Sequence, residues 1–409
     1  MNTGLVWKRD VLSNGLTVLQ YPNKSAMTAQ LSVAIKYGSN DDELEKIGAA
    51  HFLEHMLVGG SKKRISLHHQ IERMGGCSGF ETSYDSTFAW LSIFSDKIAD
   101  ASKIMAELIF DKEFENDKFE IEQKVILNEV AELSDDPRHT TEQALMKCLF
   151  PKHPIRNLIS GTKKQVKKIT LANLAEAHQN QYIPQNMIVI LTGNYSNADN
   201  IIEMFVDKQN CVLSKRQLHI ETAKPRKIAS LKKSGINQAY LCFGFRTPPA
   251  RDNDTVTLSL INSILGLGES SRLFSELREK RALTYDFLSS NNTGLDFGYF
   301  SIACVVRNTL WKQTQEIIKN ELQKLTSDTI TDDELQKSKN LILGDIVRGI
   351  DEPHELPRII ADTELMFSNE KEVRTYIEKI KHLTSQDIIN VASKYFKEEN
   401  YSTAILTPK

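Results

Sequence analysis

Two histidines and a glutamate lie close together in AAHFLEHMLVGG, residues 49–60, in the order His51, Glu54, His55. On an α-helix, residues four apart share one face, so His51 and His55 would present their imidazole nitrogens to a single point. Glu54 would lie at the rim of that face, where it could hold a water molecule without being a ligand. The pattern favours a zinc site over a core helix that merely carries polar residues.

A catalytic zinc ion needs three protein ligands and one open position, and this helix supplies two of the ligands. The stretch FEIEQKVILNEVAEL, residues 119–133, is expected to form a helix and offers four glutamates, Glu120, Glu122, Glu129 and Glu132. Glu122 and Glu129 are two helical turns apart and share a face, whereas Glu120 and Glu132 fit the solvated side. Periodicity alone does not choose among them.

The composition is typical of a globular protein large enough for two domains. The chain has 409 residues, 40% of them hydrophobic and 25% charged, and its length predicts two domains of roughly 200 residues each. A net charge of −2 gives no electrostatic basis for binding nucleic acid. No run approaches the roughly 18 uninterrupted apolar residues of a membrane-spanning helix, so no membrane association is expected.

The cysteines and the N-terminus both indicate the cellular compartment of the protein. The five cysteines form no CxxC pair and are far apart, at Cys77, Cys148, Cys211, Cys242 and Cys304. Their odd number and spacing favour reduced thiols over a disulfide framework. The start, MNTGLVWKRDVLSNGLTVL, lacks the basic and then apolar pattern of a secretion signal and indicates a strand, a turn and a second strand. These features predict a cytoplasmic protein.

Strands and helices alternate along the chain, and one helix–strand pair occurs twice. VKKITLANLAEAHQNQYIPQNMIVILT (166–192) aligns without a gap on IKHLTSQDIINVASKYFKEENYSTAIL (380–406), at a constant shift of 380 − 166 = 214 residues. Two similarly folded halves account for this repeat. The polar, basic segment between the copies predicts domains at 1–210 and 231–409, joined by a linker at 211–230.

Local patterns predict the elements that would position the candidate residues. EKIGAAHFLEHML, residues 45–57, has apolar positions at helical spacing and is followed by Gly59 and Gly60 as a stop. FETSYDSTFAWLSIF, residues 80–94, has the composition of strand. The sequence therefore predicts a helix for the two histidines and strand structure shortly after it.

These residues resemble the pitrilysin-type zinc peptidases, the inverzincins with an HxxEH motif, in particular the short-chain branch that includes the mitochondrial processing peptidase β subunit and its bacterial relatives. GSNDDELEKIGAAHFLEHMLVGGS is similar to the metal-helix signature of that family, and FEIEQKVILNEVAELSDDP is similar to its downstream helix. The likeness covers nearly the whole chain. It implies that His51, His55 and Glu129 bind one Zn²⁺ per chain and that Glu122 supports the site.

The resemblance also implies an α+β fold with two homologous αβ domains. Each domain would be a mainly antiparallel sheet covered by helices, and the two together would form half of a pitrilysin-type clamshell. Full-length members of the family close two such halves around a peptide. A homodimer is therefore implied, or a heterodimer with a homologous chain, in the cytoplasm of a bacterium.

Two further motifs concern the substrate. SSRLFSELREKRALTYDFLSS, residues 270–290, resembles the family's Arg-x6-Tyr motif, which implies that Arg278 binds the substrate and that Tyr285 hydrogen-bonds the oxyanion. Where relatives commonly carry Asn-Ala-x-Thr in a strand that pairs with the peptide, this chain has Gly79-Phe80-Glu81-Thr82. Backbone pairing at Gly79 and Phe80 is still expected, with a changed cleavage preference.

Together these features predict a zinc-dependent endopeptidase that hydrolyses peptides or unfolded segments inside a dimer chamber, with Glu54 activating zinc-bound water. One alternative is a dedicated protease that processes the leader of a modified peptide, and the residues do not separate it from general peptide degradation. Another is a non-catalytic partner subunit of the same fold. Such subunits usually lose zinc ligands, whereas this chain retains the whole set.

Overall fold

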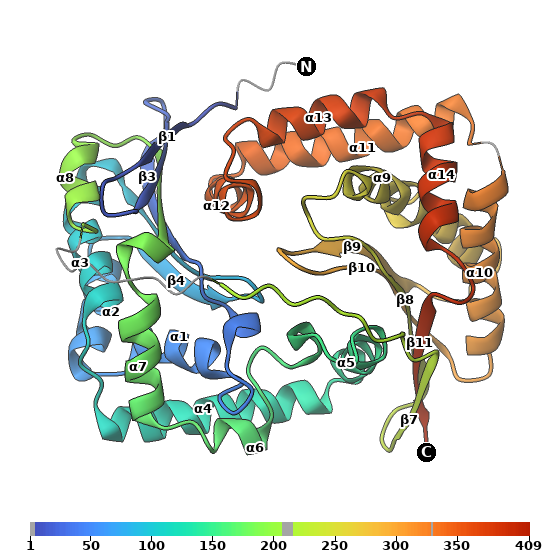
Figure 1. Ribbon diagram of the computed structural model, residues 1–409, viewed down its shortest axis with the longest axis horizontal. Coiled ribbons are helices and arrows are strands. Elements are labelled where there is room, and N and C mark those ends of the chain that lie inside the picture. Colours follow the sequence, from blue (N-terminus) through green and yellow to red (C-terminus); the bar gives the residue numbers. More distant parts are fainter. Residues whose placement is uncertain (1–4, 207–215, 329) are drawn as a thin grey trace. The chain divides into compact units, whose positions relative to one another are not determined.

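The computed structural model describes residues 5–206, 216–328 and 330–409, and its helices and strands are labelled in Figure 1. The chain forms two compact units, and each includes a segment from the other half of the sequence. The first unit comprises Met1–Ala131, Leu158–Gln217 and Gly349–Glu372. The second comprises Glu132–Asn157, Leu218–Arg348 and Val373–Lys409.

The predicted domain boundaries were linear, whereas the compact units exchange the segments 132–157 and 349–372. Within the predicted linker, residues 211–215 lie outside the described residues, and the described part passes from the first unit to the second after Gln217. The exchange could not be expected from composition, because both exchanged segments carry ordinary helical sequences. The boundaries at 210 and 231 stay a prediction.

The first unit is built on a six-stranded sheet in the order β1-β2-β6-β3-β5-β4. Strands β2 and β6 run parallel, and the other neighbours run antiparallel. The strands are β1 Lys8–Val11, β2 Thr17–Pro22, β3 Thr28–Ile35, β4 Cys77–Thr82, β5 Thr87–Phe94 and β6 Met187–Gly193. The predicted strand region 80–94 is therefore two strands with a turn at 83–86.

Helices cover both faces of this sheet in the first unit. The elements are α1 Ala49–Gly59, α2 Lys62–Arg73, α3 Ile98–Phe110, α4 Asn116–Asp135, α6 Lys163–Val166, α7 Leu171–Gln181, α8 Ala198–Glu203 and α12 Glu355–Phe367, with short 3₁₀ turns η1 Ser39–Asp41, η2 Ser95–Lys97 and η4 Pro184–Asn186. Helix α3 packs on β3 and β5, and α12 packs on β3 and β6 from the other face (Figure 1).

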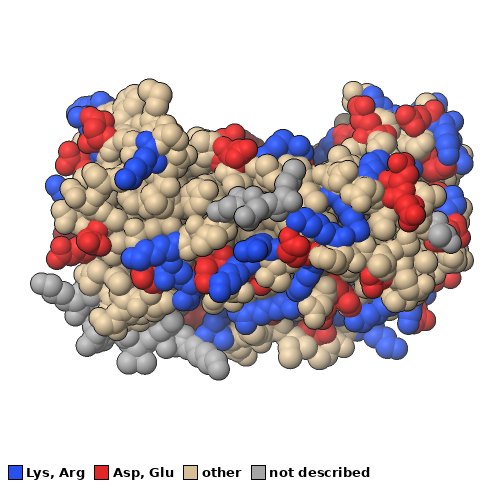
Figure 2. All heavy atoms as spheres, turned by 90° about the horizontal axis from the view of Figure 1, so that it is seen from above, with Lys and Arg blue, Asp and Glu red and all other residues tan. Residues whose placement is uncertain are grey.

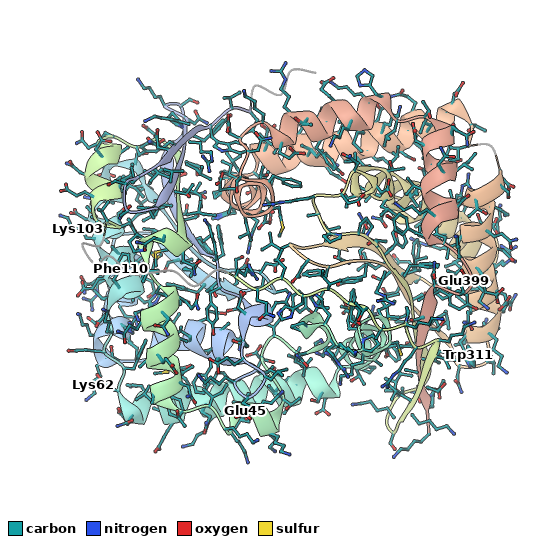
Figure 3. The ribbon with its side chains drawn as sticks, in the orientation of Figure 1. Glu45, Lys62, Lys103, Phe110, Trp311 and Glu399 are labelled. Carbon is teal, nitrogen blue, oxygen red and sulfur yellow. The ribbon has the colours of Figure 1, made fainter. Side chains whose placement is uncertain are left out.

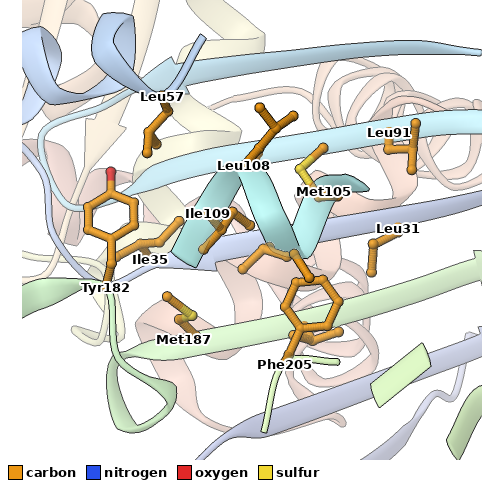
Figure 4. Packing of buried hydrophobic residues seen from close by; sticks show 14 of the residues in the cluster. Leu31, Ile35, Leu57, Leu91, Met105, Leu108, Ile109, Tyr182, Met187 and Phe205 are labelled. Carbon is orange, nitrogen blue, oxygen red and sulfur yellow. The ribbon is translucent and has the colours of Figure 1, made fainter. Parts of the chain in front are cut away.

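Alternation along β3 explains the main core of the first unit. Leu31, Val33 and Ile35 point to one face and are fully buried, as the two-residue period of a strand requires. Figure 4 shows Leu31 and Ile35 beside Met105 and other apolar side chains of α3. The helix α1 that carries the two histidines belongs to the same core, so its apolar face fixes its position.

Arg64 ties the end of α1 to the end of α3. Its buried guanidinium donates to the carbonyl oxygen of Leu57 at 3.2 Å and to those of Leu108 and Asp111. Lys62 and Phe110, labelled in Figure 3, mark the start of α2 and the end of α3 at this junction. A cation at two helix C-termini satisfies carbonyl oxygens that have no partner within their helices.

The second unit repeats the plan of the first. Its five-stranded sheet has the order β7-β11-β8-β10-β9, with β7 and β11 parallel and the other neighbours antiparallel. The strands are β7 Ile228–Lys233, β8 Gln238–Arg246, β9 Asp286–Thr293, β10 Gly298–Arg307 and β11 Tyr401–Pro408. The fold class predicted from the resemblance is thus confirmed as two αβ units with mainly antiparallel sheets.

The helices of the second unit are α5 Pro137–Leu149, α9 Asp254–Gly266, α10 Trp311–Ser327, α11 Asp332–Asp351, α13 Glu372–His382 and α14 Ser385–Tyr395, with a 3₁₀ turn η3 Pro154–Arg156 and a π-helical segment η5 Phe274–Glu279. Helices α9, α10 and α14 share a core with β8 and β10. Helix α5, from the exchanged segment, packs on β8 and β11. It corresponds to α12 of the first unit.

The repeated sequence segments form the same elements in both units. Thr170 precedes α7 and accepts a hydrogen bond from the Asn173 amide at 3.2 Å. Thr384 precedes α14 and accepts from the Asp387 amide at 3.3 Å. In each unit the helix leads into a strand, as the alignment predicted, and that strand, β6 or β11, lies in the interior of its sheet.

Acidic and basic side chains are interspersed on the face seen in Figure 2, in keeping with the small net charge. Within the described ranges, the structure has no helix that is both long enough and apolar enough to span a bilayer.

Candidate metal centre

Helix α1 begins where a buried polar cluster holds its first turn. The Asp42 carboxylate accepts hydrogen bonds from the amides of Gly48 at 2.7 Å and Ala50 at 3.0 Å, and from the Tyr37 hydroxyl at 3.0 Å. Gly48 has φ of 96°, which favours glycine, and the helix starts at Ala49. The helix predicted from residue 45 is therefore shorter at its N-terminus than expected.

His51 and His55 lie on the same face of α1, as their spacing predicted. Their ring centroids are 4.8 Å apart, and 12% and 20% of their side-chain surfaces are exposed. The opposite face carries Phe52, Leu53 and Met56, all fully buried. Packing of these apolar residues fixes the rotation of the helix and hence the direction of both imidazoles.

Glu129 of α4 lies between the two imidazoles. Its Oε1 is 3.6 Å from His51 Nε2, and its Oε2 is 3.6 Å from His55 Nε2. One ligand atom from each of the three residues lies within 4.8 Å of the other two. Glu120 and Glu132 of the same helix are exposed. Of the four candidate glutamates, the fold thus places Glu129 at the two histidines.

Glu122 lies on the other side of His55. Its Oε2 is 3.2 Å from His55 Nδ1, and only 17% of its side chain is exposed. A hydrogen on Nδ1 would satisfy this contact and leave Nε2 as a lone-pair donor. Glu122 therefore contacts a candidate ligand without joining the group that could hold the ion.

The charges of the group follow from burial and hydrogen bonding. Burial lowers the pKa of His51 to about 4. Burial also disfavours charged His55, but the carboxylates of Glu122 and Glu129 on either side of the ring outweigh burial and raise the pKa of His55 to about 9. The nearby His55 ring, 3.6 Å away, lowers the pKa of Glu129. In the metal-free protein these effects favour neutral His51, charged His55 and ionised Glu129.

The donor set fits a divalent transition metal. Two imidazole nitrogens and one carboxylate oxygen are ligands that zinc accepts, and three protein ligands leave a position open. The buried Nδ1 of His51 has no hydrogen-bond partner among the described side chains and backbone groups. The nitrogen of His51 that faces Glu129 is Nε2, so the assignment rests on the donor set and not on Nδ1.

Glu54 faces the same side of α1 and contacts the edge strand β4. Its Oε2 accepts a hydrogen bond from Thr82 Oγ1 at 2.8 Å. Burial raises the pKa of Glu54, and hydrogen bonds from Thr82 oppose that effect. A carboxylate with a raised pKa beside a metal group is suited to accept and return a proton.

The strand β4 carries the candidate residues Gly79 and Phe80. In the described part of the sheet β4 is an edge strand that pairs with β5. A Cβ on residue 79 would lie 2.7 Å from Trp90 Nε1, so glycine leaves room for the indole. Phe80 packs edge-on against His68, with ring centroids 6.0 Å apart. The free edge offers backbone groups to an added strand.

Arg278 and Tyr285 belong to the second unit and contact each other. The Arg278 guanidinium lies 4.1 Å from the centroid of the Tyr285 ring and 4.7 Å from that of Phe274. Tyr285 is 80% exposed, which leaves its hydroxyl open to solvent. The structure brings these two predicted substrate residues together in one cation–π pair, in which Arg278 is half-buried and Tyr285 is exposed.

Three residues at the site were missed by the sequence reasoning. Asp42 holds the start of α1, Gly59 makes room for Glu122, and Thr82 donates to Glu54. From the sequence, Gly59 was interpreted only as part of a helix stop. Since Gly60 follows it, the pair of glycines was the available signal that one of them has another role. Thr82 stands in the strand motif that resembles the family's, and that position was the available signal for its importance.

Comparisons with known proteins agree with the geometry. Residues 17–163 match the family model described as Insulinase (Peptidase family M16), and residues 168–342 match that of the Peptidase M16 inactive domain. A zinc protease of Mycobacterium leprae is 26% identical over 411 aligned residues, which cover 98% of this chain and 91% of the relative. The chain is thus similar to zinc proteases over nearly its full length.

Solved structures show the same fold. A protease from Helicobacter pylori superposes with a TM-score of 0.89 at 24% identity, covering 98% of this chain and 99% of the other. A protein from Pseudomonas fluorescens described as a peptidase M16 inactive domain superposes with a TM-score of 0.88 at 22% identity, covering 98% of both chains. At these identities the likeness establishes the architecture.

Proposed function

The chain belongs to peptidase family M16, the pitrilysin-type peptidases, and on that premise we propose that it is a zinc-dependent endopeptidase. The proposal rests on one observation. His51 and His55 of α1 and Glu129 of α4 bring three ligand atoms within 4.8 Å of one another, while Glu54 lies on the same face of α1. A non-catalytic subunit of the same fold would not need these four residues together.

In this proposal His51, His55 and Glu129 hold the metal. Bound zinc would supply a positive charge that polarises a peptide carbonyl and makes a water molecule more acidic. Glu54 takes a proton from the attacking water and returns it to the leaving nitrogen of the cleaved bond. Its raised pKa, caused by burial, supports this double role.

Glu122 has a supporting role in the proposal. By accepting a hydrogen bond from Nδ1 of His55, it would fix the ring orientation and keep the lone pair of Nε2 directed at the ion. The 3.2 Å contact between Glu122 Oε2 and His55 Nδ1 supports this assignment. Glu122 is therefore a positioning residue and not a ligand.

The proposed substrate is a peptide in extended conformation. It would pair with the backbone of β4 at Gly79 and Phe80, because β4 is an edge strand in the described sheet. Arg278 would bind peptide carbonyl or carboxylate oxygens, and the Tyr285 hydroxyl would donate to the oxyanion. The exposure of Tyr285 and its contact with Arg278 support this assignment.

The active assembly in this proposal is a homodimer in the cytoplasm of a bacterium, with a heterodimer with a homologous chain as the alternative. Analytical ultracentrifugation should find a dimer at working concentration. Only monomer would count against both assemblies. The similarity to a Pseudomonas fluorescens protein described as an inactive domain favours a second candidate function, a non-catalytic partner of the same fold.

A mass-spectrometric cleavage profile on a peptide library separates these functions. The enzyme should cut several extended peptides, a chelator should stop cleavage, and added zinc should restore it. Cleavage confined to one type of sequence would indicate a dedicated leader-processing protease. No cleavage by zinc-loaded protein would favour the non-catalytic partner.

A further inference from the structure

Successive residues of β4 contact different partners in the first unit. The Thr82 hydroxyl donates to Glu54 of α1 at 2.8 Å. The neighbouring Glu81 forms an ion pair with Arg358 of α12. Side chains of adjacent strand residues point to opposite faces, so the end of β4 is held from both sides of the sheet.

The turn after β4 is held as well. The Ser39 amide donates to the Ser83 carbonyl at 3.0 Å, and the Asn40 amide donates to the Tyr84 carbonyl at 2.9 Å. The same short segment carries Asp42, which binds the first turn of α1. Thr82 and the start of α1 are therefore tied to one segment of backbone, residues 39–42.

We infer that Thr82 is a positioning residue that holds the Glu54 carboxylate in the orientation needed for proton transfer. The inference rests on the proposed function and adds a residue to it. A glutamate side chain has several rotatable bonds, and a proton-transfer group must be held at hydrogen-bond distance from the proton it takes. The hydrogen bond from the Thr82 hydroxyl to Oε2 restricts the rotation of the Glu54 carboxylate.

The inference also links peptide binding to the proton-transfer group. A peptide that pairs with β4 would order the strand whose last residue holds Glu54. The pairing of the peptide and the orientation of the Glu54 carboxylate would then both depend on β4.

Two substitutions of similar size separate this role from simple packing. Thr82→Val keeps the shape and removes the hydroxyl, whereas Thr82→Ser keeps the hydroxyl. Thr82→Val should lower kcat at least about tenfold, the usual range for partners that orient a catalytic group. KM and zinc content should stay within about twofold of wild type, and Thr82→Ser should retain most of the turnover.

Crystal structures of the zinc-loaded wild type, Thr82→Val and Thr82→Ser provide a readout that does not require turnover. The Glu54 carboxylate should rotate away in Thr82→Val and stay in place in Thr82→Ser. An unmoved carboxylate in Thr82→Val, or equal loss of turnover in both variants, would overturn the inference. A wild type that cuts no peptide would contradict the proposed function, and the carboxylate positions would still decide the role of Thr82.

Discussion

The carboxylate of Glu122 occupies the space beside Gly59 that a side chain would need, since a Cβ on residue 59 would lie 2.0 Å from Glu122 Oε1. Glycine at this position therefore does more than end α1. It lets Glu122 of α4 cross the last turn of the helix and reach His55 Nδ1 at 3.2 Å. A residue without a side chain thus helps to orient a candidate ligand.

We expect Gly59→Ala to weaken zinc binding by displacing Glu122 from His55. Loss of such a supporting partner typically costs about 10- to 100-fold in metal affinity. Competition with a chromophoric chelator measures the affinity, and Val58→Ala, at the exposed neighbouring position, is the matched control. Equal zinc affinity in Gly59→Ala and wild type would contradict the role of Gly59.

Replacing Glu122 itself tests the same contact from the other side. Glu122→Gln keeps the shape but removes the negative charge that holds His55, so zinc affinity should fall by about 10- to 100-fold. Glu120→Gln, on the exposed side of the same helix, should leave the affinity unchanged. If the two variants bind zinc alike, Glu122 does not support the site.

The stability of the metal-free protein should depend on the ionisation of Asp42. Burial raises the pKa of Asp42 from 3.8 to about 7, so the folded state binds this proton more tightly than the unfolded state does. The resulting stabilisation is fully present below pH 3.8 and is lost as pH rises to about 7.

Asp42→Asn removes this titration. From pH 4 to pH 7, the free energy of unfolding of wild type should therefore fall relative to that of Asp42→Asn by up to about 4 kcal/mol. Denaturant unfolding of both proteins in the presence of a chelator, across this pH range, measures the difference. A difference that does not change with pH would exclude Asp42 as the titrating group.

Tyr285→Phe should reduce turnover without affecting the metal. The substitution keeps the ring that contacts Arg278 and removes the hydroxyl proposed to bind the oxyanion. Loss of one such donor typically lowers kcat about 100- to 1,000-fold. Because Tyr285 is 80% exposed, folding and zinc affinity should be unchanged. Unchanged kcat would remove Tyr285 from the proposed machinery.

The sequence predicted the parts of the site that depend on local spacing. The separation of His51 and His55 by one helical turn was sufficient to place both imidazoles on one face. The seven-residue spacing of Glu122 and Glu129 likewise put both on the side of α4 that faces α1. Choosing Glu129 for the group needed the family resemblance, because periodicity treats the two alike.

The parts that escaped prediction depend on contacts between distant segments. Helices α5 and α12 each pack in the unit formed mainly by the other half of the sequence, and no local pattern indicates such an exchange. Thr82 and Glu54 are brought together by the placement of β4 beside α1, and Gly59 and Glu122 by the crossing of α1 and α4. Tertiary packing brings the residues of each pair together, and the amino-acid composition does not indicate these contacts.

Bound zinc and peptide hydrolysis, measured on the same samples of wild type and Glu54→Gln, test the proposed mechanism most directly. Both proteins should bind one zinc ion per chain, because Glu54 is not a ligand. Hydrolysis should fall about 100- to 10,000-fold in Glu54→Gln, the range expected for loss of a group that transfers protons. Zinc-loaded Glu54→Gln that hydrolyses peptides at the wild-type rate would contradict the proposed mechanism.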